Sequence, residues 1–228
     1  MPETLSPGEV AHTLSHQHGH KSAGEKRAER IEILEAILLA IVAVATAWSG
    51  YQTGRWDAVQ AHEYGLSNKE RAAENRAATL SGQQRLYDTS TFGFWLQEKA
   101  AGDKEATALF ERRFRPEYRV AFNAWIKTDP LHNPRAPAGP ILMSQYHNAA
   151  AERAAKAGER ASADFEAGTK ARETGDRYLR NTVLLATVLF LTALAQKFKV
   201  TRVRLSLLGV AGTLLVVALY FVFTYPTT

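Results

Sequence analysis

Three runs of apolar residues stand out along the chain, and each is long enough to be a membrane-spanning helix. The first, 31–52, carries no charge for about 19 residues after Glu35, close to the ~20 residues that cross a bilayer. The second, 181–198, has about 16 uncharged residues and flanking side chains that can reach the interface. The third, 205–224, ends among tyrosines, as an interfacial aromatic belt does. We expect three transmembrane helices rather than buried core helices, because a chain of 228 residues offers no soluble core for three such runs to share.

The first run also contains a candidate cleavage site for a signal peptidase. Ala43, Ala45 and Ala47 match the small-residue pattern of such sites. However, about 30 residues with both acids and bases precede the run, which is too long and too mixed for a signal-peptide n-region. We therefore expect an uncleaved signal anchor.

Basic residues predict the orientation of the three helices. The short loop 199–204, together with the two residues before it, holds four bases and no acid. This charge places the loop in the cytoplasm. The tail 1–30 is then cytoplasmic, whereas 53–180 and the C-terminal 225–228 are extracytoplasmic. This topology accounts for much of the net charge of +5, so we expect no nucleic-acid partner. The four bases are Lys197, Lys199, Arg202 and Arg204.

The large segment between the first two runs has a helical pattern at both of its ends. An apolar stripe with heptad-like spacing follows the first run, and a seam of alanines spaced four and three residues apart precedes the second. Small residues let two helices approach closely, so we expect the two arms to pair as an antiparallel helical-hairpin stalk, similar to a coiled coil. The stripe consists of Val59, Leu66, Ala73, Ala77, Leu80 and Tyr87, and the seam of Ala150, Ala154, Ala157 and Ala161.

Aromatic residues gather in the middle of this segment. A second helical stripe repeats at spacings of three or four, and a proline-rich connection at 129–140 follows it. We interpret the aromatic residues as a small core at the tip of the stalk, with a ligand-binding aromatic pocket as the alternative. The stripe consists of Phe110, Phe114, Tyr118, Phe122 and Trp125.

The same region carries a resemblance to a known group of proteins. The segments FRPEYRVAFNAW at 114–125 and TDPLHNPRAP at 128–137 resemble a pattern in uncharacterised bacterial membrane proteins. Those proteins similarly have one N-terminal span and a C-terminal pair of spans. The resemblance implies a bacterial three-span membrane protein, and it implies no activity.

The N-terminal tail holds the candidate metal ligands. Four imidazoles within nine residues are able to bind zinc, nickel or copper. The tail has no apolar periodicity, so we expect 1–30 to be disordered, and the alternative interpretation is a solvated tail without a physiological metal. The four residues are His12, His16, His18 and His20.

Other polar residues give weaker indications of chemistry. A basic patch beside the aromatic stripe fits anionic lipid headgroups or an envelope polyanion, or else a solvated face paired with Glu111 and Glu117. His132 and His147 lack an obvious nucleophilic partner, and no nucleophile-elbow, zinc-protease or phosphate-loop motif is present. We expect no cofactor and no catalytic site. The patch consists of Arg112, Arg113, Arg115 and Arg119.

The first apolar run has a stripe of small residues along one face. Such a stripe favours helix pairing in lipid, because close backbone contact replaces the missing hydrophobic drive. Its partner is either small faces of the other two runs or the same helix of a second copy, which would make a homo-oligomer. The stripe consists of Ala36, Ala40, Ala43, Ala47 and Gly50, and the candidate faces of Ala186, Ala193, Gly209 and Thr213.

Together these patterns predict an all-α, multi-pass protein of a bacterial cytoplasmic membrane. The leading functional hypothesis is a non-enzymatic protein that acts in interaction, scaffolding or sensing through its extracytoplasmic domain. The alternatives are a metal-handling accessory protein that uses the histidine tail and, third, a membrane-bound enzyme. No span centre contains an ionisable residue, which argues against a pump or coupled transporter acting alone.

Overall fold

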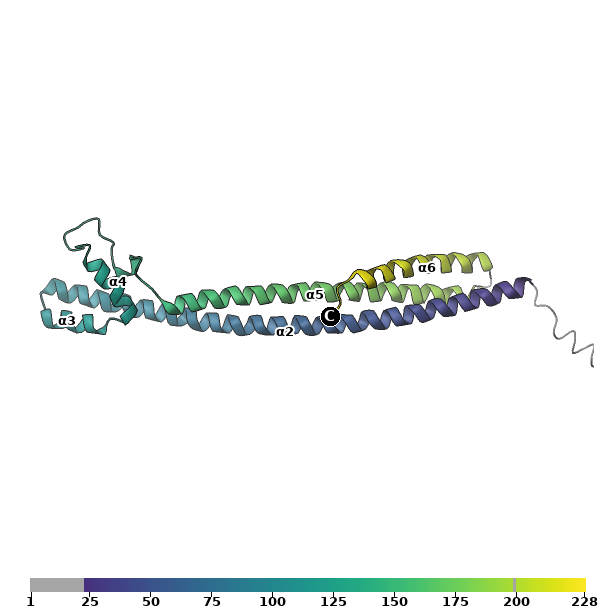
Figure 1. Ribbon diagram of the computed structural model, residues 1–228, viewed down its shortest axis with the longest axis horizontal. Helices are drawn as coiled ribbons and strands as arrows, with labels where there is room; N and C mark the ends of the chain where they lie inside the picture. The colour runs from purple at the N-terminus through teal and green to yellow at the C-terminus, as the bar shows by residue number, and fades with distance from the viewer. Residues whose placement is uncertain (1–22, 199) are drawn as a thin grey trace, which may run out of the picture. The chain divides into compact units, whose positions relative to one another are not determined.

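The computed structural model describes residues 23–198 and 200–228, and all the regular elements in these ranges are helices (Figure 1). The described chain divides into two compact units. We call 23–57 together with 172–228 the three-helix unit, and 58–171 the central unit. The helices are α2 (Ala23–Ala101), α3 (Lys104–Arg113), α4 (Pro116–Ile126), the short 3₁₀ helix η1 (Pro140–Leu142), α5 (Ala149–Ala195) and α6 (Thr201–Thr224).

Three of these helices are long and apolar enough to cross a membrane. They are α2, α5 and α6, and their apolar stretches coincide with the three runs in the sequence. The expectation of a helical chain with three helices that are able to cross a membrane is thereby confirmed for the described residues. The helices extend beyond the expected boundaries, since α2 begins at Ala23 and α6 at Thr201. Residues 1–22 and Lys199, which include part of the expected tail and loop, lie outside the described residues.

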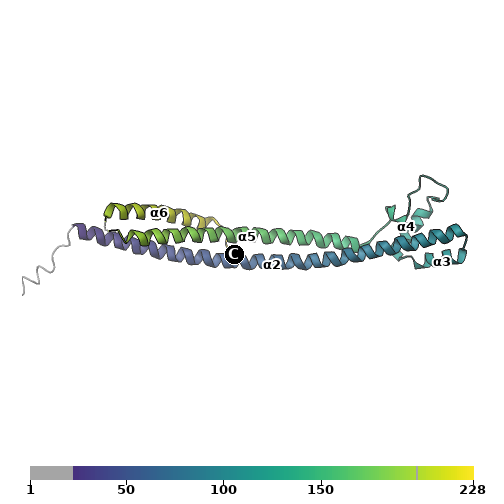
Figure 2. The same cartoon turned by 180° about the vertical axis from the view of Figure 1, so that it is seen from behind.

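The three-helix unit has an apolar core to which each of its helices contributes. In Figures 1 and 2, α6 lies alongside the C-terminal part of α5. The core combines branched side chains with alanines, and small residues of this kind let helices approach closely. The buried residues are Leu38, Val42 and Ala45 from α2, Leu185 and Val188 from α5, and Ala211, Leu215 and Ala218 from α6.

Polar contacts close both ends of this core. At one end, the Arg204 guanidinium donates two hydrogen bonds of 2.7 Å to the carboxylate of Glu35, whose exposed fraction is 3%. At the other end, the Asn181 amide donates to Ser49 Oγ (3.2 Å), and the nearby Gln52 is also buried. With a rise of ~1.5 Å per residue, Glu35 and Gln52 are about 25 Å apart along α2. This spacing is close to the ~30 Å thickness of a bilayer's hydrocarbon layer.

In the central unit, α2 and α5 lie side by side (Figure 2). Ser67 Oγ donates to the Ala161 carbonyl (2.7 Å), and the rings of Tyr64 and Phe165 stack with centroids 5.2 Å apart. Nearer the tip, the Asn148 amide donates to the Ser81 carbonyl (3.5 Å). Later positions of α2 thus meet earlier positions of α5, so the two helices run antiparallel. The four alanines of the seam are buried or half-buried, and Ala161 is fully buried.

The face of α2 that meets α5 differs from the expected one. Ser67, Glu74 and Ser81 face α5. Leu80 and Tyr87 of the predicted stripe are 40% and 45% exposed, and the other four members of the stripe are half-buried. The alanine seam brings the backbones so close that large apolar side chains have no room between them. The large Tyr64 ring fits because it lies opposite a glycine: a methyl group added at Gly168 would lie 2.5 Å from this ring. Small and polar residues of α2 therefore occupy the interface, and the predicted stripe borders it.

Candidate functional site

The tip of the central unit is built around aromatic side chains from the end of α2, from the residue that ends α3 and from α4. Their rings meet mainly edge to face, for example Trp95 against Phe122 at 4.9 Å, a favourable geometry for ring quadrupoles. Each indole also has a hydrogen-bond acceptor: Trp95 Nε1 donates to Glu111 (2.8 Å), and Trp125 Nε1 donates to the Pro137 carbonyl (2.7 Å). The proline-rich connection is thus held against the core. The buried rings are Trp95, Phe114, Tyr118, Phe122 and Trp125.

Local sequence signals explain how the chain turns at this tip. After α2, Gly102 adopts a φ of 80°, which glycine tolerates best. Asp103 then caps α3, because its carboxylate accepts from the Ala106 amide at 2.9 Å. Pro116 starts α4 at a position where no amide donor is needed. These signals place α3 and α4 beside the end of α2.

A buried ion pair joins three segments at the base of the tip. Asp88 of α2 is fully buried and accepts two hydrogen bonds from Arg115, at 2.9 and 2.6 Å. The Tyr146 hydroxyl donates to the same carboxylate (3.1 Å), and Glu117 accepts from Arg115 at 3.1 Å. Hydrogen bonding to Asp88 raises the pKa of Arg115 above its ordinary value. A bidentate, charge-assisted contact of this kind fixes geometry strongly.

Two polar groups beside this ion pair lack partners among the described residues. They are the Tyr118 hydroxyl and Gln84 Oε1, both of which are buried. Burial, with a further contribution from the charge of Asp88, raises the pKa of Tyr118 above its ordinary value. The phenol therefore stays protonated over the physiological range, and it cannot serve as a base there.

A cleft of about 580 Å³ opens between the end of α2, α4 and the loop that follows α4. Trp95 and Phe122 form its floor, and its rim carries cations such as Lys99 and acids such as Glu111 and Asp129. Its lining contains no serine, threonine, cysteine or histidine. The Glu111 carboxylate already accepts a hydrogen bond from Trp95. The cleft has the polar rim and apolar floor of a binding surface, and its lining contains no hydroxyl or thiol nucleophile.

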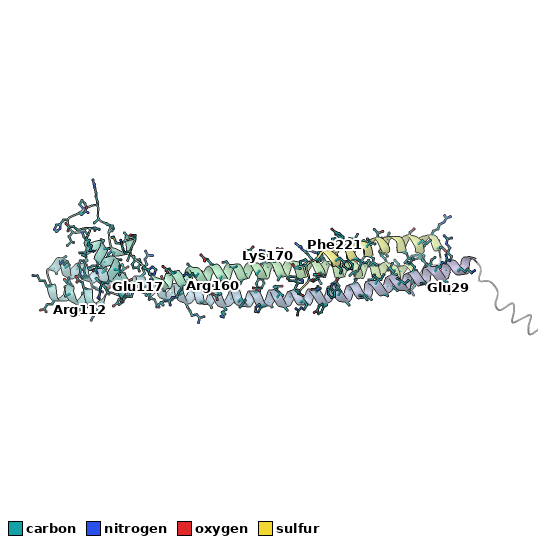
Figure 3. The ribbon with its side chains drawn as sticks, in the orientation of Figure 1. Glu29, Arg112, Glu117, Arg160, Lys170 and Phe221 are labelled. Atoms are coloured by element: carbon teal, nitrogen blue, oxygen red, sulfur yellow. The ribbon has the colours of Figure 1, made fainter. Side chains whose placement is uncertain are left out.

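The four arginines predicted as one basic patch have separate roles. Arg115 is occupied by Asp88 and Glu117, and Arg119 donates to three carbonyls at the end of α3. Arg112 and Arg113 lie in the last turn of α3, where a cation favours the helix dipole. Figure 3 shows Arg112 and Glu117 at the tip. Of the two acids expected to pair with the patch, Glu117 does so, while Glu111 bonds to Trp95.

Two of the predicted histidine sites lie within the described residues, and the other four lie outside them. His132 contacts Asp129 and His147 contacts Glu152, each at 2.9 Å and on the surface. Within 23–198 and 200–228, no three histidine, aspartate or glutamate side chains come close enough to hold a metal ion. The proposed ligands His12, His16, His18 and His20 lie outside the described residues.

The small-residue stripe of the first span faces away from the other two helices. The core of the three-helix unit uses another face of α2, through Leu38, Val42 and Ala45. The expectation that the stripe packs against the candidate faces on α5 and α6 is therefore wrong, because Ala186, Ala193, Gly209 and Thr213 are exposed as well. All five residues of the stripe are exposed: Ala36, Ala40, Ala43, Ala47 and Gly50.

Sequence reasoning missed Asp88 and the pairing of Glu35 with Arg204. A signal for Asp88 exists, since it lies seven residues after Ser81 and seven before Trp95, on the buried face of α2. Its partner Arg115 is 27 positions away, and no local pattern links the two.

Comparison of the chain with protein-family models, curated proteins and solved structures finds no match in any of the three.

Proposed function

We propose that the chain is a non-enzymatic protein of a bacterial cytoplasmic membrane that works through its central unit in interaction, scaffolding or sensing. In this proposal the three-helix unit spans the bilayer with a cytoplasmic N-terminus and an extracytoplasmic C-terminus. The spacing of its two polar layers and the basic loop between α5 and α6 support this arrangement. The resemblance of 114–137 to bacterial three-span proteins supports the assignment to bacteria.

The central unit then serves as a stalk and tip on the outer side. The observation that carries the proposal is the tip itself, in which a buried Asp88–Arg115 pair and an aromatic core support an open cleft. Because the cleft lining has no hydroxyl or thiol nucleophile, and its Glu111 and Asp129 carboxylates already contact Trp95 and His132, binding fits this site better than catalysis. We also propose that the outward small stripe of α2 pairs with a second copy in the bilayer.

Metal handling by the histidine tail is the alternative, and four imidazoles within nine residues favour it. Deletion of residues 1–24 separates the two functions. If the central unit carries the function, the deletion leaves the phenotype and the metal content of the membranes unchanged. A fall in the metal content of the membranes, together with the phenotype that loss of the whole protein causes, would favour the alternative.

The direct test is affinity purification from native membranes with quantitative mass spectrometry. Ile126→Glu and Leu131→Glu change exposed residues of the cleft, and Val120→Glu makes the same change on the exposed part of α4 outside it. We expect specific proteins to be lost with the two cleft variants and retained with the control. Identical sets of proteins for all three variants and the untagged strain would contradict the proposal.

A further inference from the structure

A line of apolar residues runs along α2 beside its contact with α5. The line repeats every seventh residue, so it follows one side of a left-handed helix pair. The two residues of the line nearest the tip already contact other parts of the central unit: the Tyr87 hydroxyl donates to the Arg113 carbonyl, and Phe94 stacks on Phe110. In the middle of the line, Leu80 is 40% exposed. The complete line is Val59, Leu66, Ala73, Leu80, Tyr87 and Phe94.

A groove of about 490 Å³ lies at the middle of this line, between α2 and α5. Its floor consists of small side chains, Ala73 and Ala77 from α2 and Ala157 from α5, with Leu80 at one end. A floor of alanines lets another helix approach closely, and a leucine beside it provides an apolar contact of the size that coiled coils use. The shape of the groove therefore suits an α-helix.

The walls of the groove are positively charged. They carry Arg76, Arg153 and Arg160, and their one acid is Glu70, which leaves an excess of two positive charges. Glu70 lies 3.7 Å from Arg160, and Arg76 donates to the Ala72 carbonyl of its own helix. Figure 3 shows Arg160 on this part of α5. An occupant with acidic residues beside an apolar stripe would match both the floor and the walls.

We propose that this groove binds an acidic amphipathic α-helix of a partner protein, which packs as a third helix against α2 and α5. Leucine-like residues at heptad spacing would contact Ala73, Ala77 and Leu80. Acidic residues flanking them would pair with Arg76, Arg153 and Arg160, as charges at the edges of coiled-coil contacts do. This inference rests on the proposed interaction function and names the partner class for one surface of the central unit.

A second copy of this chain is a poorer occupant than an acidic helix. In a symmetric pair, the same surface of both copies would meet across the axis. The three arginines would then face their own counterparts with only Glu70 to offset them. Like charges placed opposite one another disfavour such a contact.

The test uses purified full-length protein in detergent and a labelled designed helix of about three heptads, with leucines at the contact positions and glutamates beside them. A peptide with lysines in place of the glutamates and a scrambled glutamate peptide are the matched probes. We expect only the heptad glutamate peptide to raise fluorescence anisotropy, and salt to weaken its binding. Arg153→Glu should lower its affinity about tenfold and favour the lysine peptide. Lys156→Glu, an exposed change on α5 outside the groove, should leave the affinity unchanged.

Three outcomes would overturn the groove assignment. Equal binding of the glutamate and lysine peptides would show no charge selection, and equal binding of the scrambled peptide would show a site for any polyanion. If Arg153→Glu and Lys156→Glu weaken binding equally, the peptide binds elsewhere. Circular dichroism checks that both variants keep their helix content. None of these results touches the co-purification test of the cleft, so failure of this inference and failure of the proposed function remain distinguishable.

Discussion

Asp88 has an exposed fraction of 0%, and its carboxylate is held by Arg115 and Tyr146. Removing one member of a buried ion pair leaves the other with an uncompensated desolvation penalty. We predict that Asp88→Ala lowers the free energy of unfolding by about 3 kcal/mol, near the low end for buried pairs because Arg115 keeps its contact with Glu117. Denaturant unfolding followed by tryptophan fluorescence measures this, since two tryptophans lie in the adjacent core.

The control for Asp88→Ala is Thr89→Ala, which changes an exposed neighbour on the same helix. Surface substitutions of this kind change stability by less than about 0.5 kcal/mol. If both variants unfold at the same denaturant concentration as the parent chain, the ion pair does not stabilise the tip.

Tyr118 gives the tip a dependence on alkaline pH. Its pKa is raised by burial in the folded chain, while the unfolded chain releases the phenolic proton near pH ~10. The stability that this group contributes is fully present below pH ~10 and is lost as the pH rises toward the folded pKa. We predict that Tyr118→Phe reduces this alkaline loss in unfolding measurements at a series of pH values. At neutral pH the variant should be as stable as the parent or more so, because the hydroxyl has no partner among the described residues.

A Tyr118→Phe variant that loses stability at neutral pH would show that the hydroxyl makes a stabilising bond. Tyr146, whose pKa is also raised by burial, remains in the variant, so part of the alkaline loss should persist.

At the scale of elements, the pairing of α2 with α5 depends on the alanine seam. Ala161 is fully buried, and its carbonyl accepts from Ser67. We predict that Ala161→Leu destabilises the central unit by about 1–3 kcal/mol, because the close helix pair has no room for the added carbons. Ala163→Leu makes the same exchange on the exposed face of α5. Thermal unfolding in detergent checks both, and equal midpoints for the two variants would contradict close packing at the seam.

Patterns within a single helix predicted where the long helices lie and which face of α5 is buried. Pairings between residues distant in the sequence could not be predicted. The apolar runs gave the three long helices, and the spacing of Ala150, Ala157 and Ala161 gave the buried face of α5. The buried face of α2 was not predicted, because we expected the apolar residues of α2 to contact α5. The alanine seam of α5 instead requires small or polar partners. Glu35 and Arg204 meet across 169 positions, and Asp88 and Arg115 across 27, so their contacts depend on the tertiary fold.

At the scale of the whole molecule, the outward small stripe of α2 predicts self-association. Ala43 and Ala47 are exposed, so Ala43→Ile with Ala47→Ile adds bulk without a clash inside the chain. We predict loss of a crosslinkable dimer in membranes, because larger side chains keep two helix backbones apart. Val210→Ile with Val217→Ile adds one methyl group at each of two exposed positions of α6 and should leave the dimer intact. A dimer of equal yield in both double variants would exclude this stripe as the contact.

The membrane topology underlies every functional statement about this chain, and thiol labelling tests it most directly. The chain contains no cysteine, so single cysteines at Ser22, Ala155 and Thr227 report one site each. In intact spheroplasts treated with a membrane-impermeant thiol reagent, we predict that positions 155 and 227 react and that position 22 reacts only after lysis. Labelling of position 22 alone in intact spheroplasts would contradict the account, because the central unit would then lie in the cytoplasm.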